Sequence, residues 1–158
     1  MLLKLENISK SYSKERMILD QLSMEISAGE RVAIVGPSGS GKTTLLNLIG
    51  TLDRPDVGKM VFDGQDLSAM NDNQLAQFRN RKIGFVFQMH HLLPQLSLWE
   101  NVLLPTLTDP ALQRKETEER AKRLIERVGL SGVVSQKPSE LSGGECQRTA
   151  VARALINR

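Results

Sequence analysis

The glycine-rich segment Gly36–Thr43 constrains this chain more than any other part of its sequence. It reads Gly-Pro-Ser-Gly-Ser-Gly-Lys-Thr and matches the pattern G-x-x-x-x-G-K-[ST], in which consecutive backbone N–H groups can surround phosphate oxygens. The preceding run, Arg31–Val35, is continuously apolar and β-branched after its first residue, which predicts a strand buried on both faces. The following segment, Lys42–Ile49, predicts a helix whose N-terminal end adds a positive dipole. We therefore expect a strand, a phosphate-binding loop and a helix in that order.

The residue types in this loop suit a nucleoside triphosphate. Lys42 would supply a mobile positive charge for the β- and γ-phosphates, and the Thr43 hydroxyl could bind Mg²⁺. A flexible turn without function is the alternative, and the pattern's context between a strand and a helix makes it much less favoured. The candidate phosphate contacts are Gly36, Ser38, Gly39, Ser40, Gly41, Lys42, Thr43 and Thr44.

A second motif, Leu141–Glu145, begins the last predicted helix, Gly143–Asn157. Ser142 is suited to cap that helix, and Glu145 three residues later completes a capping box. Two glycines in a first helical turn cost up to about 1 kcal/mol each against alanine, so they favour close approach of a ligand to bare N–H groups. The alternative is a capped helix and nothing more. The phosphate loop about a hundred residues upstream makes that alternative less favoured.

Together, the loop and Leu141-Ser142-Gly143-Gly144-Glu145 resemble the ABC ATPases over the whole chain. This resemblance implies that Tyr12 stacks on adenine and that Gln88 contacts Mg²⁺ and senses the γ-phosphate. It also implies a head-to-tail dimer, in which Leu141, Ser142, Gly143, Gly144 and Glu145 of one copy cover the ATP bound by the other. Integral membrane permease subunits would be the other partners.

A narrower resemblance comes from Phe87–Pro94 and Glu100–Val102, which look most like the ATP-binding subunit of bacterial lipoprotein-releasing transporters. Macrolide-export and division-associated subunits are close relatives of that type. The resemblance implies an ATP hydrolase on the cytoplasmic face of the inner membrane, held there by its permease. The substrate and the direction of transport have no support in the sequence beyond this resemblance.

Composition excludes several other classes of protein. The net charge of +3 is too small and too scattered for a nucleic-acid-binding face. No apolar stretch approaches the roughly 18 residues that a membrane-spanning helix needs. The segment Met1–Glu6 carries charges within its first apolar run, which is not typical of a signal peptide. The single cysteine, Cys146, excludes an internal disulfide; its place near a helix N-terminus could lower its pKa.

The pattern along the chain predicts an α/β fold of the phosphate-loop NTPase class, with an N-terminal antiparallel β subdomain and a helical insertion. We expect one incomplete ABC ATP-binding domain, comprising a β subdomain and loop core (1–88), a helical insertion (89–140) and the signature loop with its helix (141–158). The expected strands are Leu2–Ile8, Met17–Ile26, Arg31–Val35, Gly58–Asp63 and Ile83–Phe87. The expected helices are Lys42–Ile49, Asn71–Asn80, Ser97–Leu104, Arg114–Val128 and Gly143–Asn157.

The resemblance also implies a later apolar strand ending in Asp-Glu, which would orient Mg²⁺ and the attacking water, and a later histidine. No Asp-Glu pair follows an apolar strand in these 158 residues. We therefore expect an N-terminal piece of a longer ATPase, without the core strands that would separate Arg31–Val35 from Ile83–Phe87. A module that binds nucleotide without turnover is the alternative function, and it is what we expect of the 158-residue piece in isolation. A soluble ABC protein of DNA repair or translation is a third, but its usual coiled-coil insertion or tandem cassette is not visible.

Three other residue types have simpler interpretations. His90 and His91 lack other metal-type neighbours in the sequence, so a zinc site is not favoured. Trp99, at a predicted helix start, is expected to pack against the core. Cys146 is interpreted as incidental to the site.

Overall fold

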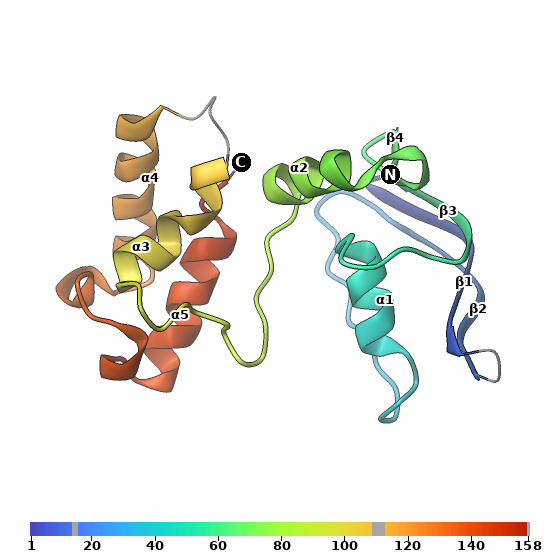
Figure 1. The fold of residues 1–158 in the computed structure, drawn as a ribbon, viewed down its shortest axis with the longest axis horizontal. Coiled ribbons are helices and arrows are strands. Elements are labelled where there is room, and N and C mark those ends of the chain that lie inside the picture. The colour runs from blue at the N-terminus through green and yellow to red at the C-terminus, as the bar shows by residue number, and fades with distance from the viewer. Residues whose placement is uncertain (14–15, 109–112, 158) are drawn as a thin grey trace. The chain divides into compact units, whose positions relative to one another are not determined.

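The computed structural model describes residues 1–13, 16–108 and 113–157 of the chain. It contains two compact units, Met1–Gln77 and Phe78–Arg158 (Figure 1). The elements of the first unit are β1 (Leu3–Ser13), β2 (Arg16–Ile26), α1 (Lys42–Ile49), β3 (Val57–Phe62), β4 (Gln65–Asp66) and η1 (Leu67–Ala69). Helix α2 (Asp72–Lys82) crosses the boundary. The second unit contains α3 (Leu98–Leu103), η2 (Leu104–Thr108), α4 (Arg114–Arg127), η3 (Ser131–Val133), η4 (Pro138–Glu140) and α5 (Gly143–Ala154).

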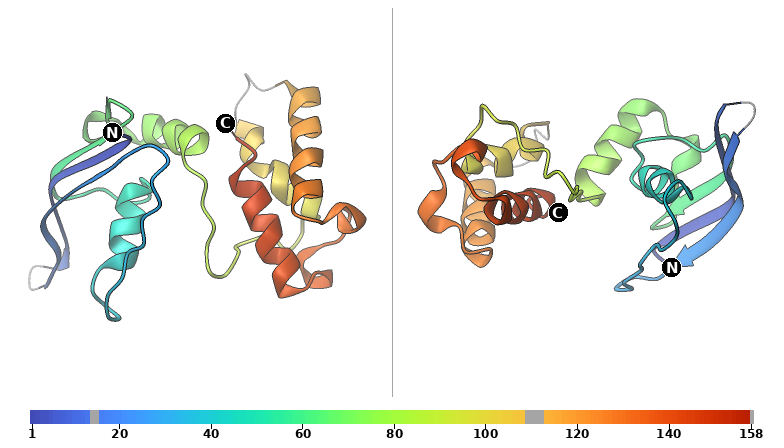
Figure 2. Two further views of the ribbon diagram at one scale, coloured as in Figure 1. Left: turned by 180° about the vertical axis from the view of Figure 1, so that it is seen from behind. Right: turned by 90° about the horizontal axis from the view of Figure 1, so that it is seen from below.

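The first unit is built on an antiparallel sheet with the strand order β2-β1-β3-β4. Strand β1 is central: Leu5 pairs with Met24 of β2 and with Met60 of β3. Its residues alternate between the two faces, so Leu3 and Leu5 are buried whereas Lys4 is partly exposed. The two views of Figure 2 agree with Figure 1 that α1 lies along one face of this sheet. The apolar core of the unit therefore lies on the face that α1 covers.

Strand β1 is longer than the sequence predicts. It continues to Ser13, beyond the predicted end at Ile8, so Tyr12 lies near the end of a strand. Several register shifts interrupt its pairing with β2, including one between Lys10 and Ser11. Such bulges increase local twist and re-aim side chains near strand ends.

The predicted strand at Arg31–Val35 is wrong. These residues form no regular secondary structure, and Val35 is 87% exposed. A strand needs a hydrogen-bonding neighbour, because unpaired N–H and C=O groups favour water over a buried site. Among the described residues no segment pairs with 31–35, so the apolar character of this run does not lead to burial here.

The second unit is a helical cluster in which α3, α4 and α5 lie side by side (Figure 1). The buried stripe of α4 is as expected: Ala121 and Ile125 are buried, and Leu124 and Val128 pack against them. Trp99 also packs against this core, as the sequence predicts. The core consists of Leu98, Val102, Ala121, Ile125, Leu130, Ala152 and Ile156.

The predicted strand at Ile83–Phe87 is also wrong, although the backbone there is extended enough for the rings of Phe85 and Phe87 to stack, with centroids 5.5 Å apart. The segment lies against the end of α5: a Cβ on Gly84 would collide with the carbonyl oxygen of Ala154. Asn157 also donates a 2.9 Å hydrogen bond to the Asn80 carbonyl oxygen. Contacts to a helix end replace the strand neighbours that the sequence predicts.

Candidate nucleotide-binding site

The phosphate loop leads directly into α1, whose first turn is not capped by any side chain. Gly41, the N-cap residue, has a φ of 89°, and a Cβ there would lie 3.1 Å from Ile18 and Leu19 of β2. Glycine is therefore required both by the left-handed backbone and by the close approach of β2. Because no acidic side chain lies in the first turn, its N–H groups and dipole remain available to an anion.

The ammonium group of Lys42 lies against the phosphate loop. Its Nζ donates hydrogen bonds to the carbonyl oxygens of Gly36 at 2.8 Å and Pro37 at 2.6 Å. Ser38, Gly39 and Ser40 are exposed, so no side chain closes over the loop. An ammonium held by neutral carbonyls can move to a phosphate, since hydrogen bonds between charged groups are the stronger ones.

Thr43 and Thr44 differ in what they can offer a ligand. Thr43 is exposed on the first turn of α1, and its hydroxyl is accessible. Thr44 is buried, so its backbone N–H, rather than its side chain, is the group that faces the end of the helix. The two residues thus provide a hydroxyl and an amide at the same helix start.

Arg16 is a basic residue beside the loop that neither sequence motif includes. Its Nη2 atom lies 3.5 Å from the position that a Cβ on Gly39 would occupy. Arg16 begins β2 and is separated from the loop by that whole strand, so no local pattern identifies it. The structure thereby brings a second positive charge to the phosphate loop.

Tyr12 is exposed, but its hydroxyl is fixed: it donates a 2.7 Å hydrogen bond to Oδ2 of Asp53. The Nζ atom of Lys10 lies over the ring, 5.2 Å from its centroid. Tyr12 and the loop both belong to the unit Met1–Gln77. An exposed aromatic ring of fixed orientation is suited to stacking on a planar ligand.

Gln88 belongs to the second unit, where it is exposed in a turn. The residues after it are tied to α5: Arg153 donates 2.6 Å hydrogen bonds to the carbonyl oxygens of both His90 and His91. Nδ1 of His90 also lies 3.0 Å from Oε1 of Gln147. The histidines therefore contribute to a connection between the Gln88 turn and α5.

The capping box predicted at the start of α5 is confirmed. Glu145 accepts hydrogen bonds from the Ser142 N–H at 2.8 Å and the Ser142 hydroxyl at 2.7 Å. These bonds, the side-chain one foremost, lower the pKa of the Glu145 carboxyl. A Cβ on Gly143 would meet nothing within 4 Å, so packing within this chain does not explain that glycine. Leu141 anchors the motif by packing against the helical core.

The expectation that a helix N-terminus could lower the pKa of Cys146 is wrong. Burial of the thiol raises its pKa, and the neighbouring Glu145 charge adds to this effect. The thiol is 5% exposed and lies 3.7 Å from the Pro138 carbonyl oxygen. Desolvation of the thiolate is therefore the main influence on the pKa of Cys146.

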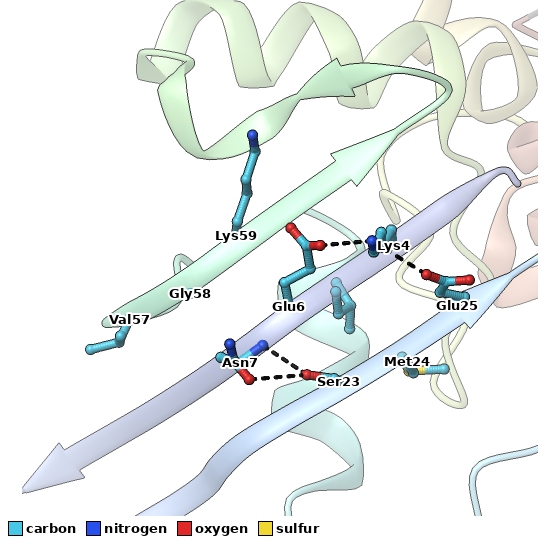
Figure 3. Close-up of a pocket in the computed structure, with 10 residues that line it drawn as sticks. Lys4, Glu6, Asn7, Ser23, Met24, Glu25, Val57, Gly58 and Lys59 are labelled. Atoms are coloured by element: carbon cyan, nitrogen blue, oxygen red, sulfur yellow. Dashed lines mark hydrogen bonds and ion pairs between the residues drawn. The ribbon is translucent and has the colours of Figure 1, made fainter.

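A separate hollow of about 760 Å³ lies on the sheet of the first unit, lined by residues of β1, β2 and β3. Figure 3 shows Lys4 between Glu6 and Glu25, with the ion pairs drawn as dashed lines. The Nζ of Lys4 lies 2.7 Å from Glu6 and 3.4 Å from Glu25. The hollow contains none of the expected nucleotide contacts, and its central lysine is already neutralised. It is not the site that the loop residues form.

A glycine-rich loop that leads into an uncapped helix N-terminus is typical of phosphate-loop nucleotide-binding proteins. The family model described as ABC transporter matches residues 19–158. The chain therefore belongs to the ABC transporter family, in which it is an ATP-binding subunit. This membership confirms the class expected from the two motifs, including its ATPase activity.

The chain is also similar to individual proteins of this family. The chain is 51% identical over 156 residues to the lipoprotein-releasing system ATP-binding protein LolD of Bacteroides thetaiotaomicron, covering 99% of this chain and 71% of that protein. It is 50% identical to LolD of Porphyromonas gingivalis, with the same coverage of both chains. The uncharacterized ABC transporter ATP-binding protein YknY of Bacillus subtilis is 48% identical, with coverage of 99% and 69%.

A solved structure confirms the expected fold class. The post-hydrolysis dimer of the ATP-binding cassette MJ0796, bound to ADP and Pi, superposes with a TM-score of 0.88 at 41% identity. The superposition covers 99% of this chain and 70% of that one. The chain thus spans about seventy per cent of the length of the relatives that it matches.

Proposed function

We propose that this chain binds and hydrolyses ATP to power an ABC transporter that releases lipoproteins from the inner membrane. The observation that carries the proposal is the phosphate loop, in which an uncapped helix start and the Lys42 ammonium meet. The identity of about 50% to LolD proteins over nearly the whole chain supports lipoproteins as the cargo. ATP hydrolysis in this family relies on positioning and charge neutralisation, and such a loop supplies the part that acts on the phosphates.

The loop residues fit a triphosphate with a divalent cation. Lys42 would move from the loop carbonyls to the β- and γ-phosphates, and Arg16 would add charge beside Gly39. The exposed Thr43 hydroxyl and the Gln88 side chain would be ligands of Mg²⁺. The cation would neutralise charge on the phosphate oxygens. Contacts of Gly36, Ser38, Ser40, Gly41 and Thr44 would be made mainly through their backbone N–H groups.

The signature segment Leu141–Glu145 would act on the nucleotide of a second ATP-binding subunit. The unobstructed Gly143 supports this proposal, since a ligand from outside the chain would account for a glycine that packing does not require. The solved relative is dimeric and carries ADP and Pi. Integral membrane permease subunits would hold the dimer at the cytoplasmic face of the membrane. Among the described residues, no helix combines the length and the apolar character needed to span a bilayer.

Reconstitution with the permease subunits of a lipoprotein-releasing transporter tests this function. We expect ATP-dependent release of lipoprotein from proteoliposomes, and we expect Lys42→Ala to abolish it. Lys59→Ala is the matched control, because it removes a lysine of the same unit that pairs with Asp66. Release that survives Lys42→Ala, or no release while another cargo moves, would contradict the proposal.

A further inference from the structure

The hydroxyl of Tyr12 is anchored although the residue is 61% exposed. A tyrosine at a strand end would ordinarily rotate among several side-chain positions and leave its hydroxyl to water. Here the hydroxyl donates to Oδ2 of Asp53, 41 residues away in sequence, at 2.7 Å. The polar edge is thus fixed to the protein while the residue remains largely exposed.

Asp53 is itself rigidly placed. Its backbone N–H and that of Leu52 both donate to the carbonyl oxygen of Asn47, in the last turns of α1. Its other carboxylate oxygen, Oδ1, accepts hydrogen bonds from the Arg54 N–H at 2.7 Å and from Lys10 Nζ at 2.8 Å. The residue that holds Tyr12 is therefore hydrogen-bonded to the last turn of the helix that begins at the phosphate loop.

Lys10 completes the arrangement from β1. It is 9% exposed and also donates to the Arg54 carbonyl oxygen at 2.7 Å. Partial burial acts to raise the pKa of the Asp53 carboxyl, but hydrogen bonds from Lys10, Tyr12 and the Arg54 N–H outweigh it and lower that pKa. Asp53 is consequently a carboxylate at neutral pH, and both of its oxygens are used.

We propose that Asp53 is a positioning residue that presents the ring of Tyr12 to the base of the bound nucleotide. The inference rests on the proposed nucleotide-binding function and adds the residue that orders the ring before the ligand arrives. Ordering a side chain in advance removes an entropic cost from binding. The base would stack on the side of the ring away from Lys10, which lies over it at 5.2 Å.

Three variants distinguish a role of Asp53 in positioning the Tyr12 ring from a general effect on the stability of the chain. Tyr12→Phe removes only the hydroxyl and leaves the Lys10–Asp53 pair intact. Asp53→Asn removes the charge of the acceptor. Asp56→Asn is the matched control, because Asp56 also lies near Lys10, at 3.6 Å, but does not bond to Tyr12. Each variant is titrated with ATP and with tripolyphosphate, which has the phosphates and lacks the base.

Stacking of the base on one aromatic ring strengthens ATP binding. A ring that is no longer held in place would lose part of this contribution. We expect Tyr12→Phe and Asp53→Asn to weaken ATP binding roughly three- to tenfold and to leave tripolyphosphate binding unchanged. We expect Asp56→Asn to bind both ligands as the unaltered chain does. Equal losses for both ligands in both variants would show a merely structural role and overturn the inference. Unchanged ATP binding in both variants would overturn it as well.

The single tyrosine of the chain gives a direct spectroscopic readout. Incorporated 3-fluorotyrosine yields one ¹⁹F signal, from Tyr12, which ATP but not tripolyphosphate should shift. Asp53→Asn should move this signal toward that of a solvated tyrosine before ligand is added, and Asp56→Asn should not. If Asp53→Asn leaves the ¹⁹F signal unchanged, the inference is contradicted but the proposed function is not. Failure of the unaltered chain to bind either ligand contradicts the proposed function and the inference with it.

Discussion

Several buried and half-buried polar side chains of this chain are held by ion pairs and hydrogen bonds to specific partners. Lys10 is nearly buried within the sheet unit, where Asp53, Asp56 and the Arg54 carbonyl oxygen surround its ammonium. Removing one partner of such a pair leaves a charge that is poorly solvated, which is why single substitutions there are costly. Asn101, fully buried in the second unit, satisfies its side-chain N–H₂ group with the carbonyl oxygens of Leu93, Leu96 and Ser97.

Cys146 provides a prediction at this scale. Because burial raises the pKa of its thiol, the folded chain disfavours the thiolate more than the unfolded chain does. The contribution of Cys146 to the free energy of unfolding is therefore fully present below the ordinary thiol pKa. It is lost as the pH rises above that value. We expect iodoacetamide at pH 8 to modify Cys146 more slowly in the native chain than in urea. Mass spectrometry measures both rates, and equal rates would contradict the burial of the thiol.

The elements that the sequence predicts well are those specified by neighbouring residues. Helix α1 has the predicted bounds, and the capping box of α5 joins residues three apart. The strands at 31–35 and 83–87 were not predictable in the same way, since a strand depends on a partner distant in sequence. Contacts such as Tyr12–Asp53 and Arg16–Gly39 cannot be inferred from local sequence for the same reason: they join segments far apart in the chain.

A pair of substitutions tests the conformation of residues 31–35. Val35 is exposed, so Val35→Ser should change the free energy of unfolding by no more than about 0.5 kcal/mol. Leu48 is fully buried beside the sheet, and Leu48→Ala should cost about 2–5 kcal/mol. Urea denaturation followed by circular dichroism measures both values. A cost for Val35→Ser above about 1.5 kcal/mol would indicate a buried strand at 31–35 instead.

The whole molecule divides its site residues between two units. Met1–Gln77 contains Tyr12, Arg16 and the phosphate loop, whereas Phe78–Arg158 contains Gln88 and the signature segment. Each unit has its own apolar core, formed against the sheet in the first and among α3, α4 and α5 in the second. The residues proposed to bind phosphate thus lie within the first unit, and we expect nucleotide binding to depend first on that unit.

Isothermal titration of the purified chain with ATP and Mg²⁺ tests this claim most directly. We expect saturable binding, and we expect Lys42→Ala to weaken it by about 1.5–3 kcal/mol, since a charge-assisted hydrogen bond to phosphate is lost. Lys59→Ala should bind as the unaltered chain does. Equal affinities for ATP in the unaltered chain and in Lys42→Ala would contradict the assignment of the loop.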